Sequence, residues 1–400
     1  LAGGLGSVGL MVIAPGAQQP TVLKTGCGNV CHTASADGST LVASQSLFSS
    51  ASYDLKNSSA QINVAGDERY TYGALFPDGS FGMSATQYRT WIPGTPSRLY
   101  DTKTGNLIPA LGWDSVITNG GTPAFSPDGK QLAFVHEDKD QGHTIAKMDF
   151  VSGNHTFSNL VDLATDPAHM LGWPSYTPDG KWVVYQAETP GSTAQGGGGP
   201  FETDSNAIGD LFIVDVASKT TQRLDALDGF TGSGTATYLP ANDPDLSFAP
   251  TVLPEAVGGY FWVVFTSHRS YGNTFGSKYG PSGSPDEYGK LWVAAIDING
   301  ATGKDASHPA FYLDGQEVTA DNLRGFWVLP PCKQQGGACS TGDECCDGFC
   351  RPSGDGGGPL ECVPPPGGCS NEYEKCSTAA DCCDPTYQCI NGRCAQPPAQ

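Results

Sequence analysis

The stretch FSPDGKQLAF, residues 125–134, decides the fold because it belongs to a pattern that recurs along the chain. In each copy an apolar segment leads into an Asp-Gly turn, and residues of alternating polarity follow. Proline before aspartate presets φ for a turn, glycine accepts a positive φ, and the alternation suits a strand between two packed sheets. Five copies carry Asp-Gly and a weaker one has Glu255 instead; they are CHTASADGSTLVAS (31–44), GALFPDGSFGMSA (73–85), TPAFSPDGKQLAFVH (122–136), WPSYTPDGKWVVYQA (173–187), APTVLPEAVGGYFWVVFTS (249–267) and HPAFYLDGQEV (308–318).

Further alternating segments lie between the copies, and each is expected to form an outer strand that ends in a polar turn: SRLYDTKTG (97–105), TIAKMDFVSG (144–153), DLFIVDVASK (210–219) and KLWVAAIDING (290–300). A period of roughly 40 to 75 residues with about four strands per unit is typical of β-propeller blades. The sequence therefore predicts an all-β fold with a six-bladed propeller. Five or seven blades stay open, because the Glu255 copy departs from the pattern. The strand around Val8–Ala14 is expected to close the ring by pairing with Phe326–Leu329.

The repeat resembles the TolB-like β-propeller family, and FSPDGKQLAF matches that family's blade signature most closely. The resemblance covers about residues 30 to 330 and implies one propeller domain over residues 1–330, with the first strand of each blade nearest the central channel. Propellers of this kind mostly bind partners, so the fold names no activity. The nucleophile elbow of hydrolases, the P-loop, H-E-x-x-H and dinucleotide motifs are missing as usable motifs. We therefore expect a binding or electron-transfer protein and not an enzyme.

Twelve of the 14 cysteines lie between Cys332 and Cys394, which predicts disulfides and an oxidising compartment, secreted or at the cell surface. Two modules, residues 331–366 and 367–400, both read C-x6-C-x5-CC followed by two further cysteines. Spacing alone permits 15 pairings of six cysteines. The order resembles the knottin (cystine-knot) family, which implies the pairs Cys332–Cys346, Cys339–Cys350, Cys345–Cys362, Cys369–Cys383, Cys376–Cys389 and Cys382–Cys394. Such modules serve either as stapled caps or as carriers of binding loops.

The other two cysteines stand in GCGNVCHTASADG, residues 26–38, where His32 directly follows Cys31. This stretch resembles the C-x-x-C-H attachment site of c-type cytochromes with one additional residue between the cysteines. The resemblance implies covalent haem on Cys27 and Cys31, with His32 as the proximal iron ligand. A Cys27–Cys31 disulfide that closes a tight loop is the main alternative, and metal-binding or redox-active thiols are a third.

Aligning the turn acids places Cys31 at the level of Thr122, so a haem is expected near one mouth of the propeller channel. We predict His308 as the distal ligand and Met170 as the alternative, because both residue types serve as axial ligands. Each also has an ordinary role, as a strand hydrogen-bonding residue or as core packing. Arg269, in FTSHRSYGNTFGSKYG (265–280) together with Lys278, is a candidate partner for the haem propionates, although the segment also suits a plain connecting loop.

The chain carries 21 basic and 41 acidic residues, a net charge of −20. This charge argues against nucleic acid and anionic membranes as partners and favours a redox or assembly partner with a basic surface, a homo-oligomer or filament included. No apolar run is long enough for a transmembrane helix. The segments HEDKDQGH (136–143), LATDPAH (163–169) and ANDPD (241–245) offer oxygen ligands suited to calcium.

Two functional hypotheses follow. The first is a secreted or cell-surface c-type haem protein in extracellular electron transfer, alone or as a subunit of a larger surface assembly. The second is a haem-free extracellular scaffold or adhesion protein in which Cys27 and Cys31 form a disulfide.

Overall fold

The structure is a computed structural model, and it describes residues 9–13, 17, 19–25, 32–46, 49–57, 59–67, 69–70, 72–85, 96–189, 208–231, 247–267, 269, 289–298, 304–316, 322, 324–329, 333, 335–345, 348–352, 358–365, 367–376, 378–390 and 393–396. The chain divides into two compact units. One comprises Leu1–Pro254 with Tyr260–Trp327, and the other Glu255–Gly259 with Val328–Gln400. This division lies close to the predicted domain boundary at residue 330, but both cysteine-rich modules belong to the second unit.

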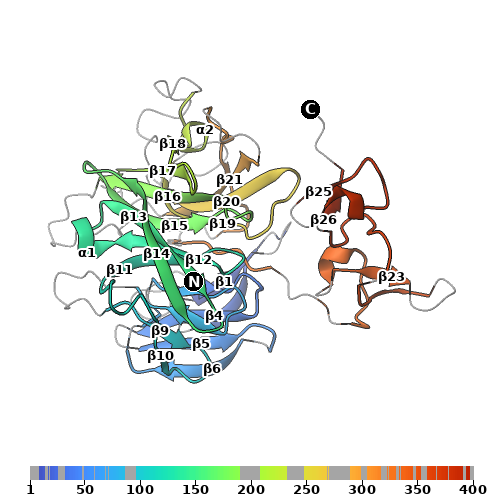
Figure 1. Cartoon of the computed structure of the whole chain (residues 1–400), viewed down its shortest axis with the longest axis horizontal. Coiled ribbons are helices and arrows are strands. Elements are labelled where there is room, and N and C mark those ends of the chain that lie inside the picture. Colours follow the sequence, from blue (N-terminus) through green and yellow to red (C-terminus); the bar gives the residue numbers. More distant parts are fainter. Residues whose placement is uncertain are drawn as a thin grey trace. The chain divides into compact units, whose positions relative to one another are not determined.

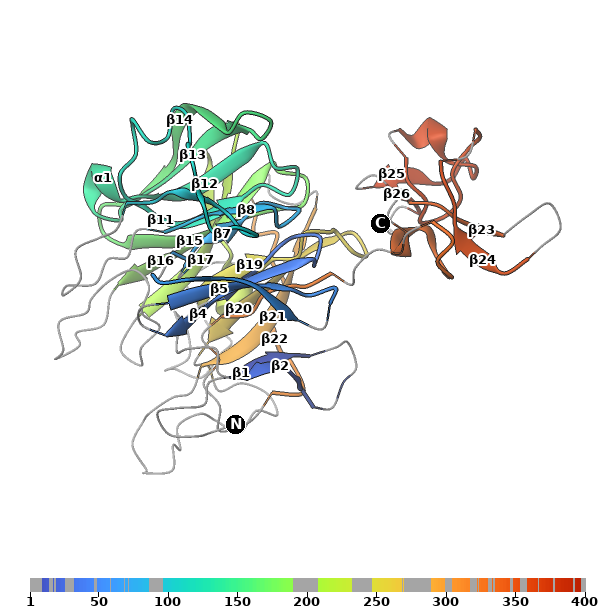
Figure 2. The same cartoon turned by 90° about the horizontal axis from the view of Figure 1, so that it is seen from below.

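The described part of the first unit contains five four-stranded antiparallel sheets, which follow one another along the chain (Figures 1 and 2). Within each sheet the strands pair in sequence order, and the first strands of consecutive sheets contact one another. This is the arrangement of propeller blades around an axis.

The blades have the following bounds. The first has β3 (His32–Ala34), β4 (Thr40–Ser46), β5 (Ser49–Asp54) and β6 (Ala60–Ala65), and the second has β7 (Ala74–Leu75), β8 (Phe81–Met83), β9 (Leu99–Asp101) and β10 (Leu107–Ile108). The third has β11 (Gly120–Phe125), β12 (Gln131–His136), β13 (Thr144–Val151) and β14 (Thr156–Thr165), with the one-turn helix α1 (Glu137–Asp140) between β12 and β13. The fourth has β15 (Met170–Tyr176), β16 (Trp182–Thr189), β17 (Ile208–Asp215) and β18 (Thr221–Arg223), followed by α2 (Asp225–Asp228). The fifth has β19 (Ser247–Val252), β20 (Tyr260–Ser267), β21 (Lys290–Asp297) and β22 (Phe311–Tyr312).

A hydroxyl two residues before the turn aspartate explains why the repeated Asp-Gly sequence forms a tight turn. Ser126 Oγ donates to Asp128 Oδ1 at 2.7 Å and accepts from the amides of Lys130 at 3.1 Å and Gln131 at 2.9 Å. Ser35 and Thr177 make the same bond to the aspartates of their own turns. Gly129 has a φ of +67°, which glycine adopts without strain. These turns join the first and second strands of blades one, three and four.

The prediction of six blades is wrong, because the last Asp-Gly copy does not begin a blade. Phe311 and Tyr312 of that copy form β22, the outer strand of the fifth blade, and they pair with Val293 and Trp292 of β21. Among the described residues after β22, no further strand of the propeller unit is present to extend a sixth sheet. The weaker copy around Glu255 supplies the two inner strands of this same blade, β19 and β20.

The predicted pairing of the N-terminal strand with Phe326–Leu329 is also wrong. The strand β1 (Gly9–Val12) pairs with β2 (Thr21–Thr25) in a separate hairpin. The described residues 326–329 belong to no strand. Leu10 of this hairpin packs into the core of the first blade beside Leu41 and Tyr53. This contact removes the apolar side chain of Leu10 from water, which favours the observed position of the hairpin.

Apolar side chains between neighbouring blades form the core of the propeller unit. Between the second and third blades it is rich in aromatic rings, among them Phe81, Trp113, Phe134 and Phe157. Between the third and fourth blades Val135, Val183 and Tyr185 contribute. The sheet of the third blade is thus covered on both faces, which explains why β12 is buried without interruption from Leu132 to Val135.

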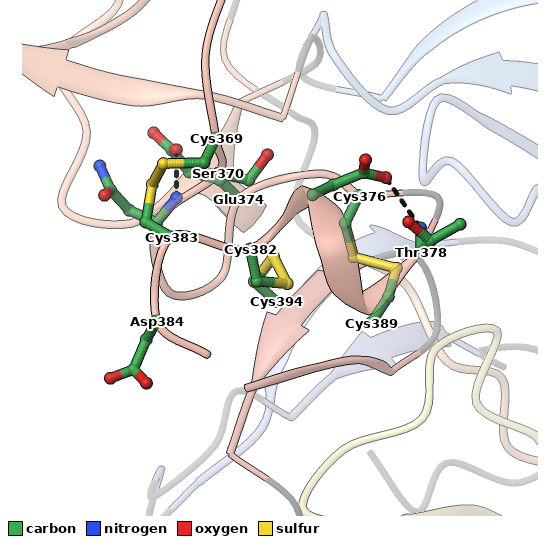
Figure 3. The surroundings of a disulfide bond; sticks show 12 residues. Cys369, Ser370, Glu374, Cys376, Thr378, Cys382, Cys383, Asp384, Cys389 and Cys394 are labelled. Carbon is green, nitrogen blue, oxygen red and sulfur yellow. Dashed lines mark hydrogen bonds between the residues drawn. A yellow bond between two sulfur atoms is a disulfide. The ribbon is translucent and has the colours of Figure 1, made fainter. Parts of the chain in front are cut away.

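The second unit contains two small hairpins and five described disulfides. Its elements are β23 (Cys350–Pro352), β24 (Leu360–Cys362), β25 (Gln388–Ile390), β26 (Arg393–Ala395) and the 3₁₀ turns η1 (Gly342–Glu344) and η2 (Ala379–Asp381). The disulfides are Cys339–Cys350, Cys345–Cys362, Cys369–Cys383, Cys376–Cys389 and Cys382–Cys394, the last three drawn in Figure 3. These are pairs of the 1–4, 2–5, 3–6 pattern. The pair Cys332–Cys346 lies outside the described residues.

The two modules pack against each other through a buried ion pair. Arg351 of the first module donates from Nε to Glu374 Oε1 at 3.0 Å and from Nη2 to Glu374 Oε2 at 2.7 Å. Glu374 is 1% exposed. The amide of Lys375 donates to the carbonyl oxygen of Gly348 at 3.1 Å across the same junction. The two modules therefore form one compact unit.

Within the described residues no helix is long and apolar enough to cross a membrane. The disulfides indicate that the protein matures in an oxidising compartment.

Candidate functional site

His32 is the part of the predicted haem motif that the structure describes. It is the first residue of β3, the innermost strand of the first blade, and it pairs with Ala43 of β4. Its side chain is half-buried, and its ring lies against that of Phe326 with the centroids 5.2 Å apart. The imidazole therefore lies at the junction between the first blade and the segment that follows the fifth.

The innermost strands share a backbone irregularity just before this position. The residue six places before the turn acid has a left-handed φ in four copies: +57° at Tyr72, +34° at Thr122, +53° at Trp173 and +49° at Ala249. In the last three blades the strand register shifts at this point, as in a β-bulge. Cys31 holds the corresponding place in the sequence of the first copy, and it lies outside the described residues, as does Cys27.

The bulge residues contact one another across neighbouring blades. The amide of Trp173 donates to Thr122 Oγ1 at 3.0 Å, and the ring of Trp173 meets that of Tyr72 edge to face with centroids 5.4 Å apart. Trp173 also packs with Phe248 and Ala249 of the fifth blade. Side chains of blades two to five therefore meet around Trp173.

Arg324 connects this cluster to His32. Its guanidinium carbon lies 4.2 Å from the ring centroid of Trp173 and 4.4 Å from that of Phe326, so the cation is stacked between two aromatic faces. Phe326 in turn contacts His32. The resulting stack runs from Trp173 in the fourth blade through Arg324 and Phe326 to His32 in the first.

The environment of His32 keeps its ring uncharged at neutral pH. Burial, and to a smaller extent the positive charge of Arg324, together lower the pKa of His32 to about 4. A neutral imidazole has a lone pair on one ring nitrogen, and this is the form that binds metals.

The two predicted distal ligands lie elsewhere. His308 is exposed; its Nε2 lies 3.0 Å from Asp297 Oδ1, and its ring contacts Tyr260, which places it at the strands β20 and β21 of the fifth blade. Met170 is the first residue of β15, and its methyl group lies at Gly142 beside the carboxylate of Glu137. No contact recorded for the described residues joins either side chain to His32, so the structure does not bring the predicted ligand pair together.

Arg269 is buried among acceptors of the protein itself. It is 2% exposed and donates to Ser267 Oγ at 2.9 Å, to Ser247 Oγ at 2.6 Å and to the carbonyl oxygen of Leu227 at 2.8 Å. A buried guanidinium needs several acceptors, and these come from the fourth and fifth blades. Arg269 is thus a packing residue between blades, and its contact with a haem propionate stays a prediction. Lys278 lies outside the described residues.

Two of the acidic segments with predicted calcium ligands lie side by side. His143 Nδ1 is 2.7 Å from the carbonyl oxygen of His169 and 3.0 Å from that of Asp166. Asp140 accepts hydrogen bonds from the amide of His143 and from Thr144 Oγ1. The carboxylates thus serve the loops' own hydrogen bonds. The segment 241–245 lies outside the described residues.

Glu137 differs from its acidic neighbours because it is buried. It is 8% exposed, and its Oε1 has no hydrogen-bond partner among the described residues. Burial, and to a smaller extent the nearby charges of Asp140 and Asp138, together raise the pKa of Glu137 to about 7.

Within the described ranges, the groups of three potential metal-ligating side chains are Cys339, Cys345 and Cys350, and Cys376, Cys382 and Cys394. Every one of these six sulfurs is in a disulfide, so none is a thiolate that could bind a metal.

Sequence reasoning missed Arg324 and Phe326. They follow the last repeat copy and carry no periodic pattern, so nothing in their local sequence connects them with His32. Trp173, by contrast, could be found from the sequence, because it stands six residues before Asp179 as Cys31 stands six before Asp37.

Comparison with protein-family models and with curated proteins yields no match. Solved structures with a similar fold include a putative TolB from Agrobacterium tumefaciens, with 16% identity over 78% of this chain and 90% of that chain at a TM-score of 0.43. TolB from Acinetobacter baumannii has 14% identity over 73% of this chain and 59% of that chain, with a TM-score of 0.41. The dihydro-heme d1 dehydrogenase NirN has 14% identity over 76% of this chain and 53% of that chain, with a TM-score of 0.38.

Proposed function

We propose that the protein is a secreted or cell-surface c-type haem protein that carries electrons to a protein partner. Cys27 and Cys31 would hold the haem covalently, and His32 would bind its iron. When bound, the haem supplies a one-electron redox centre. The chain itself would provide the attachment, the axial imidazole and the docking surface.

The observation that carries this proposal is the state of His32. Its imidazole is half-buried against Phe326, and its lowered pKa leaves it neutral at physiological pH, as an axial ligand must be. The sequence motif and the neutral state of the imidazole thus both support His32 as the axial ligand. The proposal names no sixth ligand, because the side chain of His308 lies beside Asp297 and that of Met170 beside Gly142.

The partner would be a protein with a basic surface. A net charge of −20 attracts a positively charged partner over long range and speeds its docking, more so at low salt. No substrate turnover is part of the proposal. The cysteine-rich unit would serve as an attachment or assembly module, which fits the packing of its two modules through Arg351 and Glu374.

The test is the mass and absorption spectrum of the full chain produced in a host that matures c-type cytochromes. We expect the added mass of one haem and the spectrum of a c-type haem. Replacing both Cys27 and Cys31 by serine is expected to abolish the attachment. His32→Ala is expected to keep the covalent haem and alter its spectrum, whereas His308→Ala serves as the matched histidine control.

A haem-free mass together with a Cys27–Cys31 crosslink would contradict the proposal. In that case the second candidate, an extracellular scaffold or adhesion protein, is favoured by the two modules that pack as one body. Its signature would be partner binding or self-association that survives Cys27→Ser and His32→Ala unchanged.

A further inference from the structure

We propose that Arg324 is the positioning residue of the His32 site: its guanidinium, stacked between Trp173 and Phe326, fixes Phe326 against the imidazole and places a permanent positive charge there. For a bound haem this inference rests on the proposed function. For the orientation of His32 it stands on the contacts of the chain alone.

The segment that carries Arg324 is anchored on both sides. Asn322 donates its amide to the carbonyl oxygen of Gly289 at 2.9 Å, and Trp327 Nε1 donates to the carbonyl oxygen of Thr251 at 3.0 Å. Between them Gly325 lies so close to Val264 and Leu291 that an added Cβ would be 3.0 Å and 3.2 Å from their side chains. The backbone around Arg324 is therefore held against the fifth blade.

The side chain has little freedom as well. Its guanidinium carbon is 4.2 Å and 4.4 Å from two ring centroids, a geometry in which both aromatic faces attract the cation. Phe326 is thereby pressed between Arg324 and His32. Moving the arginine would release the phenyl ring, and with it one wall of the imidazole site.

A fixed cation near an electron-accepting group favours the reduced, less positive state. Arg324 would thus raise the reduction potential of a group bound at His32. Arg69 offers a matched control, because it is also an arginine stacked on an aromatic ring. Its guanidinium carbon lies 4.3 Å from the ring centroid of Tyr100, and its Nε donates to Asp67 Oδ1.

The first experiment uses the full chain with Cys27 and Cys31 replaced by serine, so that no haem attaches. The ring resonances of His32 are recorded by NMR at pH 8 with labelled histidine and assigned by comparison with His32→Gln. We expect Arg324→Met and Phe326→Leu to shift these resonances, Arg324→Lys to shift them less than Arg324→Met, and Arg69→Met to leave them unchanged. Near-ultraviolet circular dichroism checks that each variant is folded.

The second experiment is a redox titration of the haem-loaded protein. Arg324→Met is expected to shift the reduction potential to a lower value, Arg324→Lys to retain most of the wild-type potential, and Arg69→Met to have no effect. If the wild type never carries haem, the proposed function fails while the NMR comparison still decides the role of Arg324. Unshifted His32 resonances in folded Arg324→Met and Phe326→Leu would overturn the inference, and so would a potential that Arg324→Met leaves unchanged.

Discussion

At the scale of single residues, the fold depends on a few polar groups that satisfy the backbone at the blade turns. The hydroxyls of Ser35, Ser126 and Thr177 occupy the same place in three blades and bind both the turn aspartate and the amides that follow it. The second blade has Phe76 at this place, and there Ser80 bonds to Asp78 instead. The aspartate in the repeat is thus a structural residue, which explains its recurrence without any catalytic role.

Ser126→Ala tests this role. Ser126 is 1% exposed, and the change removes the side-chain acceptor of the Gln131 amide while the Lys130 amide keeps only its bond to Asp128 Oδ1. We expect a loss of about 1–3 kcal/mol in the free energy of unfolding, measured by chemical denaturation. Ser152→Ala, at an exposed turn of the same blade, is the control and should change it by less than about 0.5 kcal/mol. Equal stability of the two variants would show that the hydroxyl is dispensable.

Glu137 makes the stability of the propeller depend on pH. Its pKa is about 7 in the folded protein against 4.5 ordinarily, so between these values the folded chain keeps a proton that the unfolded chain has released. Stability therefore falls as the pH rises through this range, by up to about 3 kcal/mol. Glu137→Gln removes the charge and should be more stable than the wild type at pH 8, by about 1–3 kcal/mol, with little difference at pH 5.

Denaturation curves at pH 5, 6, 7 and 8 measure this effect. Asp314→Asn, which removes an exposed carboxylate, is the control and should follow the wild type at every pH. A wild-type stability that does not decrease between pH 5 and pH 8 relative to Glu137→Gln would contradict the assignment.

At the scale of elements, the repeat and the segments between its copies predicted the strands well, the latter forming β9, β13, β17 and β21, and the number of blades poorly. Copies with Asp-Gly and a following alternating strand, such as residues 122–136, became β11 and β12. The last copy was misleading because a short apolar pair before Asp-Gly suits an outer strand equally, and Phe311 and Tyr312 found a partner in β21. The local pattern does not encode which strand a segment pairs with. The predicted number of blades was therefore one too high, because the last copy pairs with β21 and does not begin a new sheet.

The site was only partly predictable for the same reason. His32 was identified from a local motif, whereas Arg324 and Phe326 reach it from almost 300 residues further along the chain. Arg269 was predicted to be a candidate partner for the haem propionates in a connecting loop. Acceptors on Ser247, Ser267 and Leu227, which are scattered in sequence, bury it between blades. Contacts of this kind follow from the assembled fold and leave no signal at the residue itself.

The junction of the cysteine-rich modules yields a prediction at this scale. Glu374→Gln keeps the size of the side chain but removes the negative charge that accepts two hydrogen bonds from Arg351. We expect the free energy of association between the modules to weaken by about 1–3 kcal/mol. Hydrogen exchange of the Lys375 amide, which donates to Gly348, should become faster. Glu372→Gln, at an exposed residue of the same loop, should leave the exchange rate unchanged. Unaltered protection in Glu374→Gln would mean that other contacts hold the modules together, such as those of Arg393 Nη1 with the carbonyl oxygens of Gly342 and Gly348.

At the scale of the whole propeller unit, the segment 322–327 connects the end of the ring to its beginning. Blade five holds it through Thr251, Val264 and Leu291, and Phe326 reaches His32 in blade one. A closed ring buries the edges that an open one would expose. In the described residues this connection is made by side-chain stacking and single hydrogen bonds, because residues 326–329 form no strand. The stability of the ring and the geometry at His32 therefore depend on the same described residues, 322 and 324–327.

Gly325→Val tests this dependence. A Cβ at Gly325 would already lie 3.0 Å from Val264 Cγ2 and 3.2 Å from Leu291, so two further methyl groups must push the segment off blade five. We expect a loss of about 1–3 kcal/mol in the free energy of unfolding of the propeller unit, together with shifted ring resonances of His32, because Phe326 moves with the backbone. Gly153→Val is the matched control, since nothing lies within 4 Å of a Cβ at that turn. Denaturation and histidine NMR on the two variants separate the outcomes: a destabilised Gly325→Val with unshifted His32 resonances would uncouple ring closure from the site, and equal stability of both variants would show that the ring closes by other contacts.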